Sequence, residues 1–213
     1  MSAVAAPFSE VYSAALRGER CQVVGRAGTV QLPVAAWSRP ADGSDRAVLA
    51  LCEGPTLDVG CGPGRMTEHL TRSGNAALGI DVVPEAVRQT RARGAAALVR
   101  DVYDHVPGEG RWSTVLLADG NVGIGGDPRR LLTRVAALLA HGGRVVVDLA
   151  PPGSGLETRR LRLRTGAVQS ELFAWSTVGA DQIGVVCAGA GLVVDRLERF
   201  GDRWTAVLLK DAR

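Results

Sequence analysis

Three glycines at alternate positions form the most informative segment of the chain. Gly60, Gly62 and Gly64 follow a short apolar run that contains one carboxylate, Asp58. Glycines permit a tight turn and let a ligand approach the backbone without meeting a Cβ atom. The helix expected after Gly64 offers unpaired N–H groups to a carboxylate or phosphate. The loop is therefore predicted to bind a small ligand at the edge of a sheet, where ligands of open α/β folds bind.

The spacing of these glycines separates two classes of nucleotide-like cofactor. A dinucleotide fingerprint reads G-x-G-x-x-G, whereas this loop reads G-x-G-x-G and has Arg65 where the third fingerprint glycine would stand. Asp58 is also an acid that the fingerprint does not require. Both features argue against an NAD(P)-dependent oxidoreductase, which stays an alternative function.

Two further acids follow the next two apolar runs of the chain. Asp81 and Val82 come after the first of these runs, and Asp101 and Val102 come after the second. A carboxylate at such a strand end has lone pairs for two hydrogen-bond donors of a ligand. Because aspartate also favours turns, each acid taken alone has a structural alternative, in which it caps its own turn.

Together, the glycine loop and its acids resemble the class I SAM-dependent methyltransferases over residues 55–150. The resemblance implies SAM as the cofactor and S-adenosylhomocysteine as the product. It implies that the loop wraps the methionine part of SAM and that Asp58, Asp81 and Asp101 meet its amino group, its ribose and its adenine. The full set of expected cofactor contacts is Tyr12, Asp58, Gly60, Cys61, Gly62, Pro63, Gly64, Arg65, Asp81, Val82, Asp101, Val102 and Asp119. A protein that binds SAM without turnover is a second alternative.

The segment after the fourth apolar run is expected, from the same resemblance, to border the transferring methyl group. It contains Asp119 and Asn121 in a glycine-rich stretch over residues 118–127, similar to that of some bacterial members of the family. Asp119 and Asn121 are the candidate catalytic residues, with Asp119 as a possible general base. Alternatively, Asp119 only contacts SAM and the glycines form a flexible connection. Positioning alone can accelerate methyl transfer, so the reaction does not require a base.

The identity of the methyl acceptor is only narrowed by what this segment lacks. Family members that methylate amino groups of nucleobases or glutamine often carry an (Asp/Asn)-Pro-Pro-aromatic motif here, and this chain does not. The small net charge of +3 does not indicate the concentrated basic patch that nucleic-acid binding usually needs. We therefore expect a small-molecule acceptor and no nucleic-acid partner.

Several side chains elsewhere are candidates for an acceptor site, each with a structural alternative. Tyr12 is expected to contact the SAM carboxylate or the acceptor, or else to pack in the interior. Trp37 and Trp175 are candidate walls of an acceptor pocket, although tryptophan more often serves packing. In the run 159–164, arginines at alternate positions would share one face of a strand. Such a face could attract an anion, but a solvated face is the simpler interpretation.

The elements that must position these residues alternate between strand and helix from residue 55 onward. Strands are expected at 56–59, 76–80, 96–100, 114–118 and 144–149, helices at 65–73, 84–94, 127–142 and about 179–190, and a closing hairpin at 192–199 and 203–210. Such alternation implies right-handed crossovers and a parallel sheet. The expected fold is α/β and Rossmann-like: a seven-stranded, mostly parallel sheet with helices on both faces and a C-terminal antiparallel hairpin strand.

The leader, residues 1–54, is expected to form a lid of one helix and one hairpin over the SAM site. Its elements are predicted as a helix at 8–16, strands at 21–25 and 29–36, a loop at 40–45 and a short helix through 48–51. Residues 55–213 form the SAM-binding domain in this interpretation, and the two parts make one compact unit.

Composition indicates an ordinary globular protein. The chain has 213 residues, of which 46% are hydrophobic and 22% charged. Its four cysteines and three isolated histidines lack metal-ligand spacing, so no metal site is expected. No apolar run approaches the roughly 20 residues of a membrane span. With no secretion signal in the sequence, reduced thiols, a cytoplasmic location and no membrane partner are expected.

Overall fold

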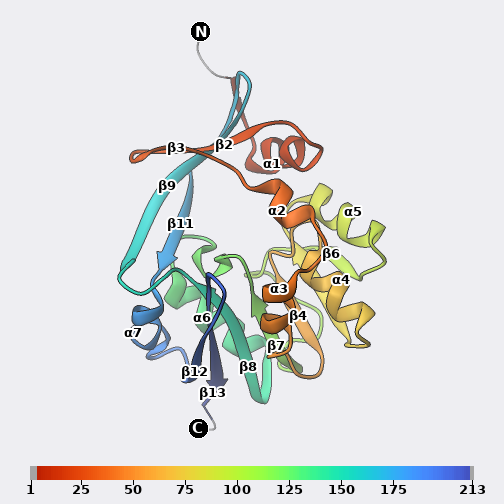
Figure 1. Cartoon of the computed structure of the whole chain (residues 1–213), viewed down its shortest axis with the longest axis vertical. Coiled ribbons are helices and arrows are strands. Elements are labelled where there is room, and N and C mark those ends of the chain that lie inside the picture. Colours follow the sequence, from red (N-terminus) through yellow and green to blue (C-terminus); the bar gives the residue numbers. More distant parts are fainter. Residues whose placement is uncertain (1–3, 212–213) are drawn as a thin grey trace.

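The computed structural model describes residues 4–211, and its larger sheet has seven strands in the order β12-β13-β8-β7-β4-β5-β6 (Figure 1). These strands are β4 (Thr56–Val59), β5 (Ala77–Asp81), β6 (Ala97–Val99), β7 (Trp112–Leu117), β8 (Leu139–Leu149), β12 (Leu192–Phe200) and β13 (Arg203–Lys210). All neighbours from β8 to β6 are parallel, and β13 is antiparallel to both β8 and β12. The predicted mostly parallel sheet with one reversed hairpin strand is confirmed.

Helices cover both faces of this sheet because successive side chains of a strand point to opposite faces. Val115 and Leu117 of β7 share a buried cluster with the helices on one face, and Leu116 shares a second cluster with those on the other. The first face carries α6 (Pro128–Leu138) and α7 (Ile183–Cys187), the second carries α3 (Gly43–Leu49) and α4 (Arg65–Arg72), and α5 (Pro84–Ala92) packs on β5 and β6. The double covering explains why the central strands are mostly apolar.

A second sheet joins the leader to a segment inserted between β8 and α7. Its order is β1-β10-β9-β2-β3, and β11 pairs with β9. The strands are β1 (Val4–Ala6), β2 (Cys21–Gly25), β3 (Gly28–Gln31), β9 (Leu156–Thr165), β10 (Val168–Ser170) and β11 (Phe173–Val178). The arginine-rich run is thus a strand. Helix α1 (Phe8–Leu16) packs on this sheet through Val11 and Ala15, which share a buried cluster with Leu163.

Two boundaries in the leader differ from the prediction. Residues 34–36 were expected to continue a strand but lie in α2 (Val34–Ser38), because β3 ends at Gln31 and the fixed φ of Pro33 suits the start of a helix. Residues 43–45 were expected to be loop but begin α3. Asp42 and Asp45 there form a reciprocal capping box, which stabilises a helix start.

Two helices of the main domain are shorter than predicted. Helix α6 ends at Leu138 rather than at Gly142 and Gly143, because Leu139 already pairs with Trp112 and begins β8. The expected helix at about 179–190 is reduced to a 3-10 turn, η2 (Ala180–Gln182), followed by the five residues of α7. Within residues 4–211, no helix is long and apolar enough to cross a membrane.

Candidate cofactor and acceptor site

The glycine loop lies between the end of β4 and the start of α4, as predicted. Gly60, Gly62 and Gly64 have φ of 72°, 55° and 89°, a left-handed backbone that favours glycine. A Cβ on Gly64 would lie 2.6 Å from Thr90 Oγ1, whereas one on Gly62 would meet nothing nearer than Tyr12 Oη, at 3.8 Å. Gly64 therefore serves packing, and the bare backbone of Gly62 faces open space beneath the tyrosine.

Asp81 joins this loop to the end of the neighbouring strand β5. Its Oδ2 accepts a hydrogen bond from the Gly62 N–H at 3.0 Å, and its Oδ1 accepts one from the Val83 N–H at 2.9 Å. Burial raises the pKa of Asp81, and these backbone donors oppose the rise. The Asp81 carboxylate therefore lies beside the glycine loop and has further lone pairs for a ligand's hydroxyls.

Asp58 lies beneath the loop and is fully buried. Its Oδ2 accepts a 2.6 Å hydrogen bond from Thr67 Oγ1 on α4. Burial raises the pKa of Asp58 to about 7, although the hydrogen bond from Thr67 opposes the rise. Cys61 of the loop is buried as well, with its Sγ 3.7 Å from Thr90 Oγ1. These two side chains thus support the loop from within.

Tyr12 covers the loop from α1, where an aromatic cluster begins. Its ring stacks on Phe8 at a centroid distance of 5.6 Å and lies 6.3 Å from the ring of Trp37. Burial raises the pKa of the Tyr12 phenol, and the carboxylate of Asp81 adds to the rise. The hydroxyl is therefore a hydrogen-bond donor at neutral pH, above the backbone of Gly62.

The segments that follow β5 and β6 contain candidate side chains of unequal accessibility. Asp101 is exposed, and its Oδ1 accepts a hydrogen bond from the Tyr103 N–H at 2.9 Å. Val102 is only 4% exposed and packs in the main core, whereas Val82 after β5 is 48% exposed. Of the two valines, Val82 is thus the one whose side chain a ligand can cover.

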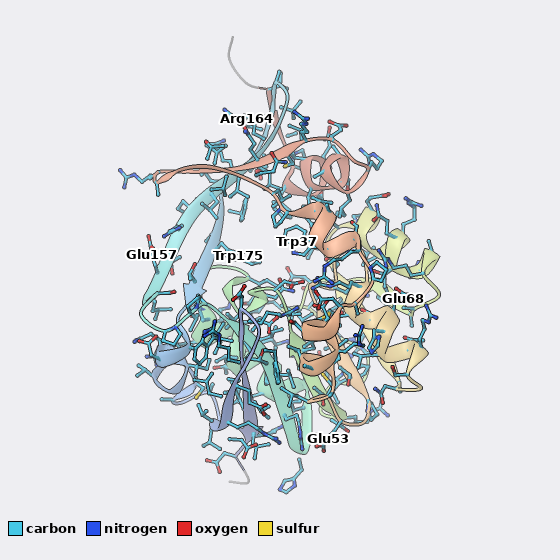
Figure 2. All side chains as sticks on the ribbon, viewed as in Figure 1. Trp37, Glu53, Glu68, Glu157, Arg164 and Trp175 are labelled. Carbon is cyan, nitrogen blue, oxygen red and sulfur yellow. The ribbon has the colours of Figure 1, made fainter. Side chains whose placement is uncertain are left out.

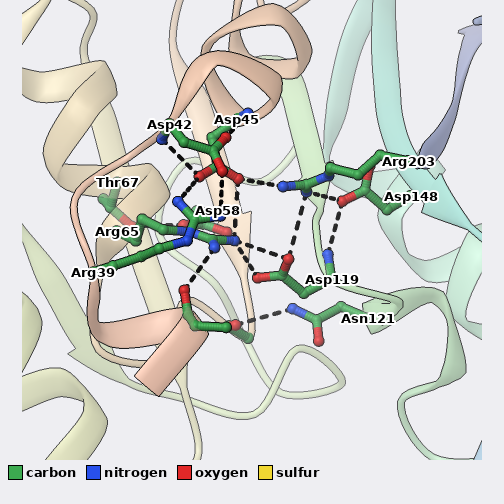
Figure 3. Close-up of polar contacts among 12 residues, drawn as sticks. Arg39, Asp42, Asp45, Asp58, Arg65, Thr67, Asp119, Asn121, Asp148 and Arg203 are labelled. Carbon is green, nitrogen blue, oxygen red and sulfur yellow. Dashed lines mark hydrogen bonds and ion pairs between the residues drawn. The ribbon is translucent and has the colours of Figure 1, made fainter. Parts of the chain in front are cut away.

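Asp119 is held in place from several sides (Figure 3). Among the described non-glycine residues it alone has a left-handed backbone, with φ of 53°. Its two carboxylate oxygens accept hydrogen bonds from Arg65 at 2.8 and 2.6 Å, and its N–H donates to Asp148 Oδ2 at 2.9 Å. Arg203 lies 3.5 Å from Asp119 Oδ1. Strained backbone of this kind persists where its surroundings fix it, commonly at functional sites.

The same cluster ties the leader to the C-terminal hairpin. Arg203, next to the hairpin turn, contacts both Asp45 of α3 and Asp148 of β8. Burial by itself raises the pKa of Asp45, but hydrogen bonds from the Asp42 N–H and Arg39 and the charges of the neighbouring arginines outweigh it and lower the pKa. The sequence does not single out Asp45, Asp148 and Arg203, since partners up to 158 residues apart leave no local signal.

One donor of this cluster is unused. Arg65 is 4% exposed, and its guanidinium also donates to the carbonyl of Ala36 at 3.0 Å. Its Nε is the only buried side-chain nitrogen or oxygen among residues 4–211 that has no hydrogen-bond partner. A buried donor without a partner is costly, so a ligand oxygen that reached it would be stabilised. The unused Arg65 Nε and the open space above the Gly62 backbone fit a ligand with a carboxylate end, as SAM has.

Asn121 connects the glycine loop to the turn after β7. Its Nδ2 donates to the carbonyls of Val59 and Gly60 at 2.8 and 2.9 Å. It begins a 3-10 turn, η1 (Asn121–Gly123), inside the glycine-rich stretch. A Cβ on Gly123 would overlap the carbonyl oxygen of Ser176, and one on Gly126 would lie 2.5 Å from Ala174 Cβ. Glycines in this stretch therefore let β11 pack directly on the turn.

Two cavities lie at opposite ends of the strands of the large sheet. One of about 190 Å³ is lined by residues 148–150 and 175–178 together with Gly120 and Val122, next to the turn η1. The other, of about 290 Å³, lies near Glu53 and residues 140–144, at the amino ends of the central strands. Although larger, the second cavity is remote from the glycine loop, so the first is the relevant one for chemistry at that loop.

Metal-ligating side chains do not gather in the part of the chain that the structure describes. No group of three His, Cys, Asp or Glu residues within it is placed to hold a metal ion. All four cysteines, Cys21, Cys52, Cys61 and Cys187, are free and buried. The chemistry available at the site is therefore that of carboxylates, backbone amides, arginines and aromatic rings.

Comparison with known proteins assigns the central part of the chain. Residues 56–143 match the family model described as a methyltransferase domain. No curated protein matches the chain.

Solved structures with a similar fold include a SAM-dependent methyltransferase from Bacteroides fragilis in complex with S-adenosylhomocysteine. Its TM-score is 0.79, at 20% identity over 96% of this chain and 94% of that one. A TehB-like SAM-dependent methyltransferase from Corynebacterium glutamicum has a TM-score of 0.60, at 20% identity over 95% and 97%. The 1,6-didemethyltoxoflavin-N1-methyltransferase of Burkholderia thailandensis has a TM-score of 0.58, at 17% identity over 79% of each chain. These likenesses establish the fold.

The domain match covers the residues that form the glycine loop, the two acids after it and the turn at Asn121. The geometry of that loop fits a carboxylate-bearing nucleoside, and the match does not favour the alternative of an oxidoreductase. Residues 56–143 therefore match a methyltransferase domain, and the chain has the fold of solved SAM-dependent methyltransferases.

Proposed function

We propose that this domain transfers the methyl group of SAM to a small-molecule acceptor bound beside the turn η1. The observation that carries the proposal is the open cradle at Gly62, bounded by the Asp81 carboxylate and the Tyr12 hydroxyl. In support, the similar Burkholderia protein is named for a small-molecule acceptor, 1,6-didemethyltoxoflavin.

Each side of the cradle has a distinct part in holding the cofactor. Asp81 would accept the ribose hydroxyls and exposed Asp101 the adenine amino group. Asp58 would face the amino group of the methionine part, and Arg65 Nε would donate to its carboxylate. When bound, SAM supplies a methyl group already activated by its sulfonium.

We further propose that Asp119 is a positioning residue rather than a general base. Both of its oxygens accept hydrogen bonds from Arg65, and its N–H is bound to Asp148. A proton on this carboxylate would weaken both its hydrogen bonds with Arg65 and its ion pair with Arg203. The acceleration would then come from holding the acceptor in line with the methyl group, which can contribute as much as about 7–11 kcal/mol.

The test is transfer of label from methyl-labelled SAM to a small-molecule extract. The wild-type chain should yield a labelled product, and Asp81→Asn should lower both the affinity for S-adenosylhomocysteine in calorimetry and the labelling. Thermal unfolding of the variant controls for its fold. Binding without any labelled product would favour the non-catalytic alternative, and absence of binding would refute the proposal.

A further inference from the structure

The cavity beside the turn η1 is adjacent to the glycine loop, because a residue between two of its lining residues is hydrogen-bonded to that loop. Gly120 and Val122 line it, and Asn121 between them donates to the carbonyls of Val59 and Gly60. A molecule in this cavity of about 190 Å³ is therefore next to the backbone that begins the cradle. The position suits an acceptor that must reach the methyl group.

One wall of the cavity is the indole of Trp175, which the turn holds in place. A Cβ on Gly123 would lie 2.7 Å from Trp175 Nε1, so only a glycine lets the ring approach this closely. Trp175 also forms a backbone bridge with Ile124. The ring is thus fixed against η1, as a binding surface must be to avoid the entropy cost of ordering a mobile side chain.

The remaining walls offer no free charge. Leu149, Ala150 and Val178 are apolar. The Asp148 carboxylate accepts hydrogen bonds from Arg203, Thr205 and the Asp119 N–H. The Ser176 hydroxyl is bound to the carbonyl of Gly126. A charged occupant would lose its hydration without gaining a partner of opposite charge, whereas an apolar ring would gain contact area.

A second indole, that of Trp37, belongs to the leader and is not among the residues that line the cavity. Figure 2 shows Trp37 and Trp175 on opposite sides of the space between the second sheet and the large sheet. Trp37 belongs to α2 and lies 6.3 Å from the ring of Tyr12 over the glycine loop. Both indoles are partly exposed, so each has surface available to a ligand. The indole of Trp175 by itself favours a flat occupant, because aromatic rings attract one another in stacked and edge-on arrangements.

We infer that the methyl acceptor is an uncharged, planar aromatic or heteroaromatic molecule whose ring lies against the indole of Trp175. The inference deepens the proposed function and rests on it. It assigns Trp175 as the residue that selects for a ring, and it assigns no role to the arginines on the outer part of β9.

The test uses 2-naphthol as a probe and its saturated counterpart, decahydro-2-naphthol, as the matched non-aromatic ligand. Saturation-transfer NMR titrations are run with the full chain, with and without S-adenosylhomocysteine. The wild type should bind 2-naphthol about five to tenfold more tightly than the saturated alcohol, as expected for one or two aromatic contacts. It should also bind 2-naphthol more tightly than anionic 2-naphthoate.

Variants locate the probe. Trp175→Ala should lose the preference for the aromatic alcohol, and Trp175→Phe should keep most of it. Trp112→Phe is the control, because Trp112 begins β7 at the opposite, amino end of the central strands, and it should behave as wild type. All three should bind S-adenosylhomocysteine within about threefold of wild type in calorimetry, which shows that the fold is intact.

Three results would overturn the inference: equal binding of the two alcohols by wild type, an unchanged preference in Trp175→Ala, or tighter binding of the naphthoate. The proposed function fails separately. A chain that prefers 2-naphthol but does not bind S-adenosylhomocysteine would contradict the function and leave the ring site standing.

Discussion

The two halves of the site are built from different kinds of chain segment. Apart from Tyr12, the cofactor half comes from consecutive strand ends between residues 58 and 101, and its acids and glycines stand at regular positions in the sequence. The acceptor half combines the turn η1, the end of β8 and the inserted strand β11, and Arg203 of the C-terminal hairpin holds Asp148 in its wall. A binding site made from one repeating pattern can be read locally, whereas one made from distant segments is defined only when the chain has folded.

The largest expected effect is on the cofactor half. A Cβ on Gly64 would lie 2.6 Å from Thr90 Oγ1 and 2.8 Å from its Cα, on a backbone with φ of 89°. Gly64→Ala should therefore destabilise the fold by about 3 kcal/mol or more, from overpacking and strain together, and abolish binding of S-adenosylhomocysteine. Urea unfolding and calorimetry measure both.

Gly94 provides the matched control for this variant. Its φ of 85° is nearly the same, but a Cβ there would meet nothing within 4 Å. Gly94→Ala should cost only about 1 kcal/mol, the backbone penalty alone, and leave binding unchanged. Equal losses of stability in Gly64→Ala and Gly94→Ala would show that the packing of Gly64 against Thr90 is unimportant.

The acceptor half should respond differently to a similar substitution. Gly123→Ala would place a Cβ on the carbonyl of Ser176 and push β11 and Trp175 from η1. We expect a loss of about 1–3 kcal/mol in stability and a fall of about 100-fold in methyl transfer, since a misplacement near 1 Å can cost that much. The affinity for S-adenosylhomocysteine should stay within a few fold.

For Gly123→Ala, Gly184 on α7 is the reference position. A Cβ there would meet nothing within 4 Å, and its backbone is not left-handed. Gly184→Ala should stabilise the protein by about 0.5–1 kcal/mol, because alanine suits a helix better than glycine. If Gly123→Ala impaired cofactor binding as severely as Gly64→Ala, the separation of the two halves would be wrong.

A smaller effect distinguishes the two roles of Asp119, where the halves meet. Asparagine tolerates a left-handed backbone and can still accept a hydrogen bond from Arg65, so Asp119→Asn should keep methyl transfer within about tenfold of wild type. Asp119→Ala loses both the tolerance of this backbone and the hydrogen bond from Arg65, so its rate of methyl transfer should fall further. Steady-state rates with the labelled-SAM assay give the comparison. A general base would instead be lost to the same extent in both variants.

The remaining expected effect is a pH dependence of stability from Asp58. Burial raises its pKa from the ordinary 3.8 to about 7, so the native state keeps a proton that the unfolded chain releases near pH 4. The contribution of Asp58 to the free energy of unfolding is therefore fully present below pH 4 and falls as the pH rises to about 7, by at most about 1.4 kcal/mol per pH unit. Asp58→Asn should lack this fall in urea titrations between pH 4 and 7. Parallel curves for the two proteins would contradict a raised pKa.

Most of the large sheet was predictable because its signals are short-range. Apolar runs mark β4 to β8, and Gly74 and Gly94 mark the ends of α4 and α5. The predicted boundaries that were wrong also have local causes, which the helix and strand propensities of the residues do not reveal. Leu139 leaves the helical pattern of α6 because Trp112 offers it a strand partner, and the leader residues 34–36 leave the strand pattern after Pro33.

The second sheet was the main feature that the sequence did not reveal. The pairing of β9 with β2 joins residues more than 130 positions apart, as in the register of Cys21 with Thr165. The hydrophobic alternation of a strand says which faces it has but not which strand lies beside it. For this reason the leader could be predicted as a hairpin, while its union with the inserted segment could not.

By itself, the sequence determined the cofactor loop, the strand-end acids and the order of strand and helix, because each depends on residues that are neighbours along the chain. Tertiary structure alone decided that Asp119 is clamped by Arg65 beside Arg203, and that Trp175 stands against Gly123. Ion pairs and ring contacts act over a few ångströms of space, and only folding brings such distant residues within that range.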